Sequence, residues 1–235
     1  MKEWFNSNFL LLNFDKTYYM QFITKNKFLN KINIEHDNKM ILQTNFVKLL
    51  GKTIDNTLPW KQHIDTITPK LNKACYIIRG SKLYLSNDAI KMVYYAFFHS
   101  VMSYGLIFGG NSTKGKCVLK LQKRAIRIIM GAKNNDSRRE FFKILRILPL
   151  SAQYIYSLLM FVVNNRNLFL DNAELYTIKT RNSYNLHPPL SHLTKYQKAV
   201  HCASIRIFNH LPTSIKSIAN ETKEFKKALT LRLPD

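Results

Sequence analysis

The stretch KLQKRAIRIIMG, residues 120–131, predicts an amphipathic helix whose two faces differ in chemistry. Extended back to Lys116 and turned by about 100° per residue, it places apolar side chains on one face and basic side chains on the other. Gly131 supplies the C-terminal stop, because glycine readily takes the left-handed conformation that ends many helices. The predicted apolar face comprises Val118, Leu121, Ala125, Ile128 and Ile129, and the basic face comprises Lys116, Lys120, Lys123 and Arg127.

The basic face has the dimensions of a contact with a phosphate backbone. At a rise of about 1.5 Å per residue it runs roughly 16 Å, which is about four or five phosphate steps along one strand. Arg124 adds a further positive charge to the same helix. A solvated helix face kept soluble by its charge is the competing interpretation of this stripe.

The charge of the whole chain favours a polyanionic partner. Its 235 residues include 36 Lys and Arg against 14 Asp and Glu, which gives a formal net charge of +22. Such an excess indicates nucleic acid or an acidic membrane surface. The middle of the chain is especially basic, so that Arg138 and Arg139 extend the predicted anion-binding surface beyond the helix.

Composition also predicts a folded, intracellular protein. The hydrophobic content of 46% is enough for one or two cores. Three widely spaced cysteines, and a Met1 that leads straight into a polar segment, indicate a reducing compartment, nucleus or cytoplasm, and no secretory signal. Residues 89–108 approach the length of a membrane span, but Lys91 and His99 favour a buried core helix, so we expect no membrane span.

Hydrophobic periodicity changes near Pro59. Residues 10–54 show short alternating runs with a turn at Asp37-Asn38, which predict four or five short antiparallel strands. After Pro59 apolar residues recur at three and four, so the expected fold class is α+β, a small antiparallel strand region followed by a mainly α-helical remainder. The predicted segments are 1–56, 57–132 and 133–235, the last with a loop at 164–189.

Several helices have predicted starts and inward faces. Helices are expected to begin near Pro59, Ser86, Asp136, Ser151 and Asn220. The inward face of the first comprises Ile64, Ile67, Leu71, Ala74 and Ile78, and that of the second comprises Val93, Phe97, Val101 and Met102.

No local pattern of catalytic or metal-binding residues is present. His187, His192, His201 and Cys202 lie close in sequence, but their spacing fits no standard zinc site. The aspartates are scattered singly, whereas two-metal polymerases and nucleases need paired carboxylates. We therefore predict no catalytic residues, no metal site and no cofactor.

Six segments, taken in order, carry a family resemblance. WFNSNFLLLNFDKTYYMQF (4–22) has a Trp-Phe helix end and an Asn-x-x-Lys-Thr hairpin, and VKLLGKTIDNTLPWKQHID (47–65) has a Leu-Gly-x-x-Ile-Asp strand with downstream Trp and His. The others are VYYAFFHSVMSYG (93–105), LQKRAIRIIMGAKNNDS (121–137), YQKAVHCASIRIFNHLP (196–212) and FKKAL (225–229). Together they resemble the end of the palm, the primer grip, the thumb and the C-terminal region of reverse transcriptases from jockey-like insect non-LTR retrotransposons.

The resemblance implies a truncated polymerase. The two catalytic blocks of the family lie upstream of the Trp-Phe motif, so we expect this chain to be a C-terminal remnant, and any Mg²⁺ would belong to the missing palm. Leu49 replaces the Phe of the primer grip, and Phe108-Gly109-Gly110 replaces a Phe-Trp-Gly of the family. Asp136-Ser137-Arg138-Arg139 likewise replaces a Cys that is usual there.

The resemblance also assigns roles to single residues. Lys16 matches a lysine proposed to act as general acid near the leaving pyrophosphate, although a hairpin-tip lysine is the alternative. Leu49, Leu50 and Gly51 match the primer grip, and a core strand ending at a turn is the alternative there. The basic helix falls in the thumb, where it would track the template–primer backbone.

The leading hypothesis is a reverse transcriptase fragment, RNA-directed DNA polymerase by ancestry, that binds RNA or an RNA–DNA hybrid through sequence-independent backbone contacts. It is expected to be unable to polymerise alone and to associate with the missing polymerase portion. The alternatives are a stand-alone basic nucleic-acid-binding or interaction module, including one retained for a host role, and a peripheral membrane protein.

Overall fold

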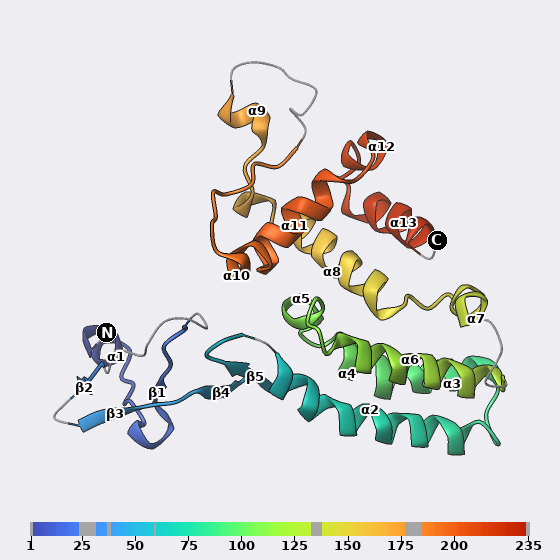
Figure 1. Ribbon diagram of the computed structural model, residues 1–235, viewed down its shortest axis with the longest axis horizontal. Helices are drawn as coiled ribbons and strands as arrows, with labels where there is room; N and C mark the ends of the chain where they lie inside the picture. Colours follow the sequence, from blue (N-terminus) through green and yellow to red (C-terminus); the bar gives the residue numbers. More distant parts are fainter. Residues whose placement is uncertain are drawn as a thin grey trace. The chain divides into compact units, whose positions relative to one another are not determined.

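The computed structural model describes residues 2–23, 32–36, 39–58, 60–132, 138–176 and 185–233. The chain is mainly helical with two small sheets, which confirms the predicted α+β class (Figure 1). It divides into two compact units, residues 1–66 and 67–235. The boundary lies within a helix and falls later than the predicted one after residue 56, and the second unit is not divided further.

The first unit contains a short helix, a 3₁₀ turn and two small sheets. The strands are shorter than predicted, and β1 pairs parallel with β3, whereas β2 pairs antiparallel with β3 and β4 with β5. The prediction that all strands are antiparallel is therefore wrong for β1. The elements are α1 (Lys2–Ser7), η1 (Phe14–Lys16), β1 (Tyr18–Tyr19), β2 (Ile34–His36), β3 (Lys39–Gln43), β4 (Phe46–Leu49) and β5 (Lys52–Asp55).

The Asn-x-x-Lys-Thr segment forms a capped 3₁₀ turn. Asn13 accepts a hydrogen bond from the Lys16 amide through its side chain, and the Thr17 hydroxyl donates to the Asn13 carbonyl oxygen at 2.6 Å. The side chain of Lys16 is exposed. Because β1 follows this turn and pairs with β3, Lys16 does not lie at the tip of a β-hairpin.

The second hairpin has its turn at Leu50-Gly51. Both residues have positive φ, 47° and 75°, as a two-residue type I′ turn requires. Leu49 and Leu50 are 55% and 79% exposed, so this segment is a solvent-exposed hairpin turn and not the end of a core strand. The other predicted turn, Asp37-Asn38, lies outside the described residues, but His36 and Lys39 on either side pair as expected.

The helices of the second unit follow the predicted series with small shifts. Ser86 is an N-cap as predicted, whereas α8 begins after Pro149 and α13 after Glu221, close to the predicted Ser151 and Asn220. Pro59 and Asp136 lie outside the described residues. The elements are α2 (Lys61–Ser81), α3 (Asn87–Val93), the π-helix η2 (Tyr94–His99), α4 (Ser100–Ser103), α5 (Leu106–Gly109), α6 (Gly115–Met130), α7 (Arg138–Leu145), α8 (Leu150–Asn164), the 3₁₀ helix η3 (Arg166–Leu168), α9 (Asn172–Leu175), α10 (Thr194–Gln197), α11 (Val200–Asn209), α12 (Thr213–Lys216) and α13 (Thr222–Arg232).

One core lies between α2, the α3–η2–α4 segment and α6. On α2 the predicted face is buried except for Ile67, which is half-buried. On α3–η2–α4 only Met102 of the predicted face is fully buried. The buried face also repeats every four residues but is offset by one position from the predicted one, and the nearly continuous apolar sequence of this segment does not indicate which face turns inward. The buried residues there are Ile90, Tyr94, Phe98 and Met102.

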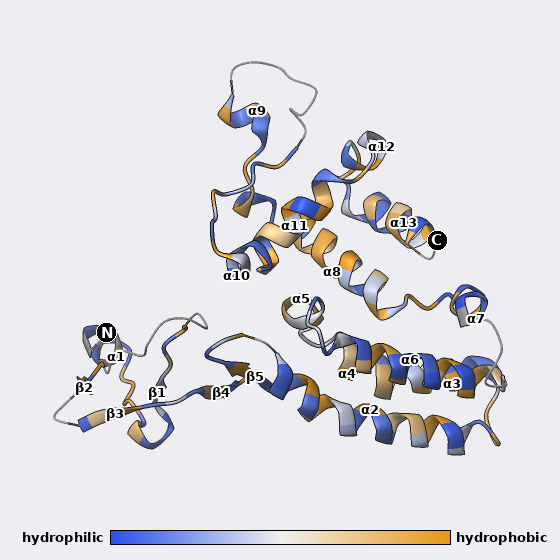
Figure 2. Cartoon of the chain, in the orientation of Figure 1, coloured by the Kyte–Doolittle hydropathy of each residue, from blue (hydrophilic) through white to orange (hydrophobic). Residues whose placement is uncertain are grey.

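A second core joins α8, α11, α12 and α13. Figure 2 shows α8 mostly in hydrophobic colours, whereas α6 alternates between hydrophobic and hydrophilic residues. Phe169 and Leu186, from the segment predicted as a loop at 164–189, also enter this core. The described parts of that segment, 164–176 and 185–189, contain η3, α9 and a bridge between Asp171 and Leu186, which the prediction of a loop did not include.

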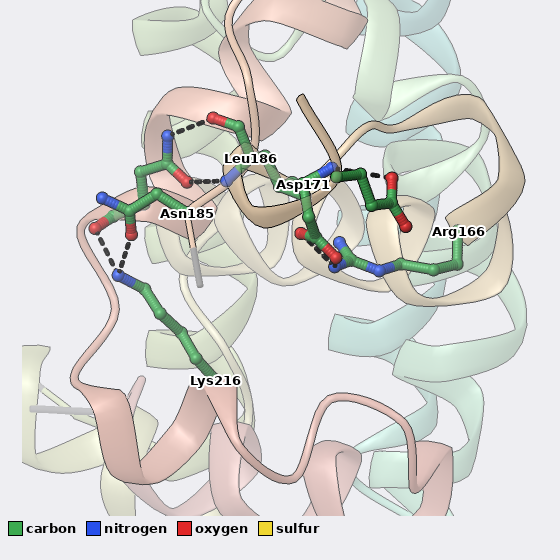
Figure 3. A network of polar contacts seen from close by, with 7 residues as sticks. Arg166, Asp171, Asn185, Leu186 and Lys216 are labelled. Atoms are coloured by element: carbon green, nitrogen blue, oxygen red, sulfur yellow. Dashed lines mark hydrogen bonds and ion pairs between the residues drawn. The ribbon is translucent and has the colours of Figure 1, made fainter. Parts of the chain in front are cut away.

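Polar contacts fasten this segment to α11 and α12 (Figure 3). The side chain of Asn209 accepts a hydrogen bond from the Leu186 amide at 2.8 Å and donates one to the Leu186 carbonyl oxygen at 2.9 Å. It thus pairs with the Leu186 backbone as a neighbouring strand would. Lys216 Nζ donates to Asn185 Oδ1 at 2.8 Å and to the Asn209 carbonyl oxygen at 2.7 Å. Burial lowers the pKa of Lys216. These contacts supply hydrogen-bond partners for the backbone of this segment where it enters the core.

Gly110 lets α5 approach α8 closely. A Cβ at this position would lie 2.2 Å from the Tyr154 ring and 2.8 Å from the Leu106 carbonyl oxygen. We expect Gly110→Ala to destabilise the protein by about 1–3 kcal/mol, because the backbone must shift to admit the methyl group. Gly80→Ala is the matched control, since no atom lies within 4 Å of its Cβ and alanine is the better helix former. Urea unfolding followed by circular dichroism measures the free energy of unfolding of both variants. Stabilisation of both would contradict the prediction.

Candidate functional site

Helix α6 has one face buried in the core and a basic face on the opposite side. The helix ends as predicted at Gly131, whose φ is 68°. The buried face is rotated slightly from the predicted one, because Gln122 and Ile126 are fully buried while Leu121 and Ile128 are half-buried. On the other side Lys116, Lys120 and Arg124 are exposed, and Lys123 and Arg127 are half-buried. The basic stripe, defined here as Lys116, Lys120, Lys123 and Arg127, therefore lies along an accessible face.

Helices α2 and α6 run parallel. Cys75 Sγ donates to the Leu121 carbonyl oxygen at 3.8 Å, and Lys82 Nζ donates to the Ile128 carbonyl oxygen at 2.7 Å. Both contacts join residues 46 positions apart, so the register between the two helices is constant and they end at the same level. Because the C-terminal end of a helix carries about half a negative charge, Lys82 also stabilises α6 electrostatically.

A basic pocket opens where α2 and α6 end. Its volume is about 490 Å³. Its described lining consists of four cationic side chains, two from each side of the helix pair, together with three apolar residues and Gly131, and includes no carboxylate. The lining residues are Arg79, Lys82, Leu83, Arg124, Arg127, Ile128, Gly131 and Ala132.

Arg79 and Arg124, which line the pocket, both act electrostatically on the thiol of Cys75. Burial raises the pKa of the Cys75 thiol, and the charges of Arg124 and Arg79 oppose that rise. The two arginines come from different helices, and both are exposed. Arg124 is among the residues predicted from the sequence, whereas Arg79 and Lys82 are not, because only the parallel packing of α2 and α6 brings these positions to the pocket.

Apart from Arg124 and Arg127, the described lining of this pocket includes no predicted site residue. Arg139 is exposed on α7, which packs against α6, and the side chain of Arg138 lies outside the description. Lys16 and the Leu49–Gly51 turn belong to the first unit. The structure therefore joins Arg124 and Arg127 of the predicted set with two further cations, Arg79 and Lys82.

Gln122 is a buried polar junction behind the basic face. Its Nε2 donates to the Tyr94 hydroxyl at 3.1 Å and to the Leu148 carbonyl oxygen at 2.9 Å, and its Oε1 accepts from the Leu150 amide at 2.8 Å. Burial raises the pKa of Tyr94, and the hydrogen bond from Gln122 opposes the rise. One side chain thus connects α6, η2 and the start of α8, and fixes the helix that carries the stripe.

Within the described ranges, no three His, Cys, Asp or Glu side chains gather as a metal site would require. His201, one of the residues considered for zinc, stacks on Phe169 with ring centroids 4.8 Å apart and contacts the Leu168 carbonyl oxygen. No single described helix is long and apolar enough to cross a membrane, although Arg139–Leu145 and Leu150–Asn164, bent by 51°, meet that test as a pair. Comparison with protein-family models, curated proteins and solved structures finds no match to this chain.

Proposed function

We propose that this chain binds the phosphate backbone of RNA or of an RNA–DNA hybrid through α6, as the thumb-side part of a non-LTR reverse transcriptase. The observation that carries the proposal is the accessible basic stripe on α6, opposite a face that is locked into the core. Basic side chains at this spacing neutralise successive phosphates and need no particular base sequence. The family assignment rests on the ordered sequence segments, and a stand-alone binding module would use the same surface.

Binding to nucleic acid and to acidic lipid separates this proposal from the membrane alternative. The full chain is titrated by fluorescence anisotropy against a labelled RNA–DNA hybrid, with two unrelated sequences, at several salt concentrations. We expect similar affinity for both sequences and a steep fall of affinity with salt, because counterions are released from phosphates. Vesicles that contain phosphatidylserine serve as competitor. Displacement of the hybrid by a small excess of these vesicles would contradict the proposal and favour a membrane surface.

A further inference from the structure

The pocket at the common end of α2 and α6 holds more positive charge than the helix ends require. Two helix C-termini together carry about one negative charge, because each contributes roughly half. Lys82, bonded to the Ile128 carbonyl oxygen, already offsets most of the α6 share. Arg79 and Arg124 line the same pocket, and none of its described lining residues is a carboxylate. Once Lys82 is set against the two helix ends, a positive charge of about two remains for an anion.

Two of these cations are available to a ligand. The side chains of Arg79 and Arg124 are exposed and make no hydrogen bond or ion pair with any other residue that the structure describes. They come from different helices, and both act on the thiol of Cys75, so their charges approach one region from two sides. Guanidinium groups in such an arrangement bind phosphate oxygens through paired, charge-assisted hydrogen bonds.

The pocket also continues the basic stripe. Arg127 belongs to both, since it is the last basic residue of the stripe and lines the pocket. Leu83, Ile128 and Ala132 add apolar lining, and a volume of about 490 Å³ lies within the range of small-ligand sites. A strand whose phosphates follow the stripe would thus reach a cationic recess that has room for one nucleotide.

We propose that this pocket binds a phosphomonoester, the terminal phosphate of a nucleic-acid strand or of a free nucleotide. A terminal phosphate has three free oxygens and nearly two negative charges at neutral pH. An internal phosphodiester has two free oxygens and one charge, and its chain must leave in both directions. The recess at the end of the stripe therefore favours the terminal group. The inference rests on the proposed function, because the strand is delivered by the stripe.

The test compares oligonucleotides that differ only at their ends. The full chain is titrated with one labelled single-stranded RNA carrying a 5′-phosphate, a 3′-phosphate or hydroxyls only. We expect one phosphorylated form to bind about tenfold more tightly than the hydroxyl form, the gain that one added charge-assisted contact supplies. Adenosine monophosphate and inorganic phosphate, added as competitors, distinguish a nucleotide site from a site for the phosphate group alone.

Two variants separate this inference from the proposed function. Arg79→Gln/Arg124→Gln should bring the ratio close to one, whereas Lys116→Gln/Lys120→Gln/Lys123→Gln should weaken all forms and keep the ratio. Lys70→Gln/Lys73→Gln, exposed on α2 outside the pocket, is the control and should also keep it. Equal affinity of the three RNAs for the unmodified chain would overturn the inference without any variant. A preference that survives in Arg79→Gln/Arg124→Gln would overturn this pocket as its origin, and failure of every RNA to bind would overturn the proposed function instead.

Discussion

Gln122→Ala is expected to lower the free energy of unfolding of the second unit by about 3–5 kcal/mol, the largest loss for any single side chain considered. The substitution removes three hydrogen bonds, two of them buried and one part-buried, and leaves the Leu148 carbonyl oxygen and the Leu150 amide without this partner. Each unsatisfied buried group costs about 1–3 kcal/mol, and the cavity left by the side chain adds to the cost. Urea unfolding followed by circular dichroism measures the difference.

Gln197→Ala is the matched control, because this glutamine is exposed and its side chain donates one hydrogen bond, to the Ser191 carbonyl oxygen. We expect it to change the free energy of unfolding by no more than about 0.5 kcal/mol. Gln122→Leu, which fills the space but pairs with no backbone group, should fall between the two. If Gln122→Ala lost less than about 1 kcal/mol, the junction would not hold α6 against η2 and α8.

Replacing the three lysines of the stripe should change the salt dependence of nucleic-acid binding. Lys116→Gln/Lys120→Gln/Lys123→Gln leaves the buried face of α6 and the pocket intact. Each phosphate contact on a duplex contributes about −0.9 to the slope of log affinity against log salt, so the slope should flatten by roughly two to three units. Anisotropy titrations of an RNA–DNA hybrid from low to moderate salt give the slope for parent and variant.

Lys223→Gln/Lys226→Gln/Lys227→Gln removes the same charge from exposed positions of α13. This control distinguishes a contact at the stripe from a general effect of net charge, since it should leave most of the slope unchanged. Circular dichroism should show equal helix content in all three proteins. Equal flattening in both variants would mean that binding depends on total charge and that the stripe is a solvated helix face.

The sequence predicts features that depend on neighbours along the chain. The Ser86 cap and the Gly131 stop depend on local backbone chemistry, and the buried face of α2 follows from helical periodicity. The predicted face of α3–η2–α4 is offset by one position from the buried one, because apolar residues are nearly continuous there and periodicity alone does not choose between neighbouring faces.

Features that depend on distant residues escaped prediction. The parallel pairing of β1 with β3 joins residues far apart in sequence, and periodicity does not specify a partner strand. Gln122 looks like one more polar residue of an amphipathic helix, and only the packing of α8 shows that it is buried. The candidate site was half predictable for the same reason, since Arg124 and Arg127 belong to the quoted helix, while Arg79 and Lys82 join them through tertiary structure.

The pairing of α2 with α6 leaves the outward side chains of α6 free to vary. The hydrogen bonds from Cys75 and Lys82 both end on main-chain carbonyl oxygens, which every amino acid at positions 121 and 128 retains. Substitutions along the outward side of α6 therefore alter the ligand surface without altering the acceptors that align the two helices. Single substitutions on this surface can therefore change the ligand preference while the alignment of α2 with α6 and the fold stay the same.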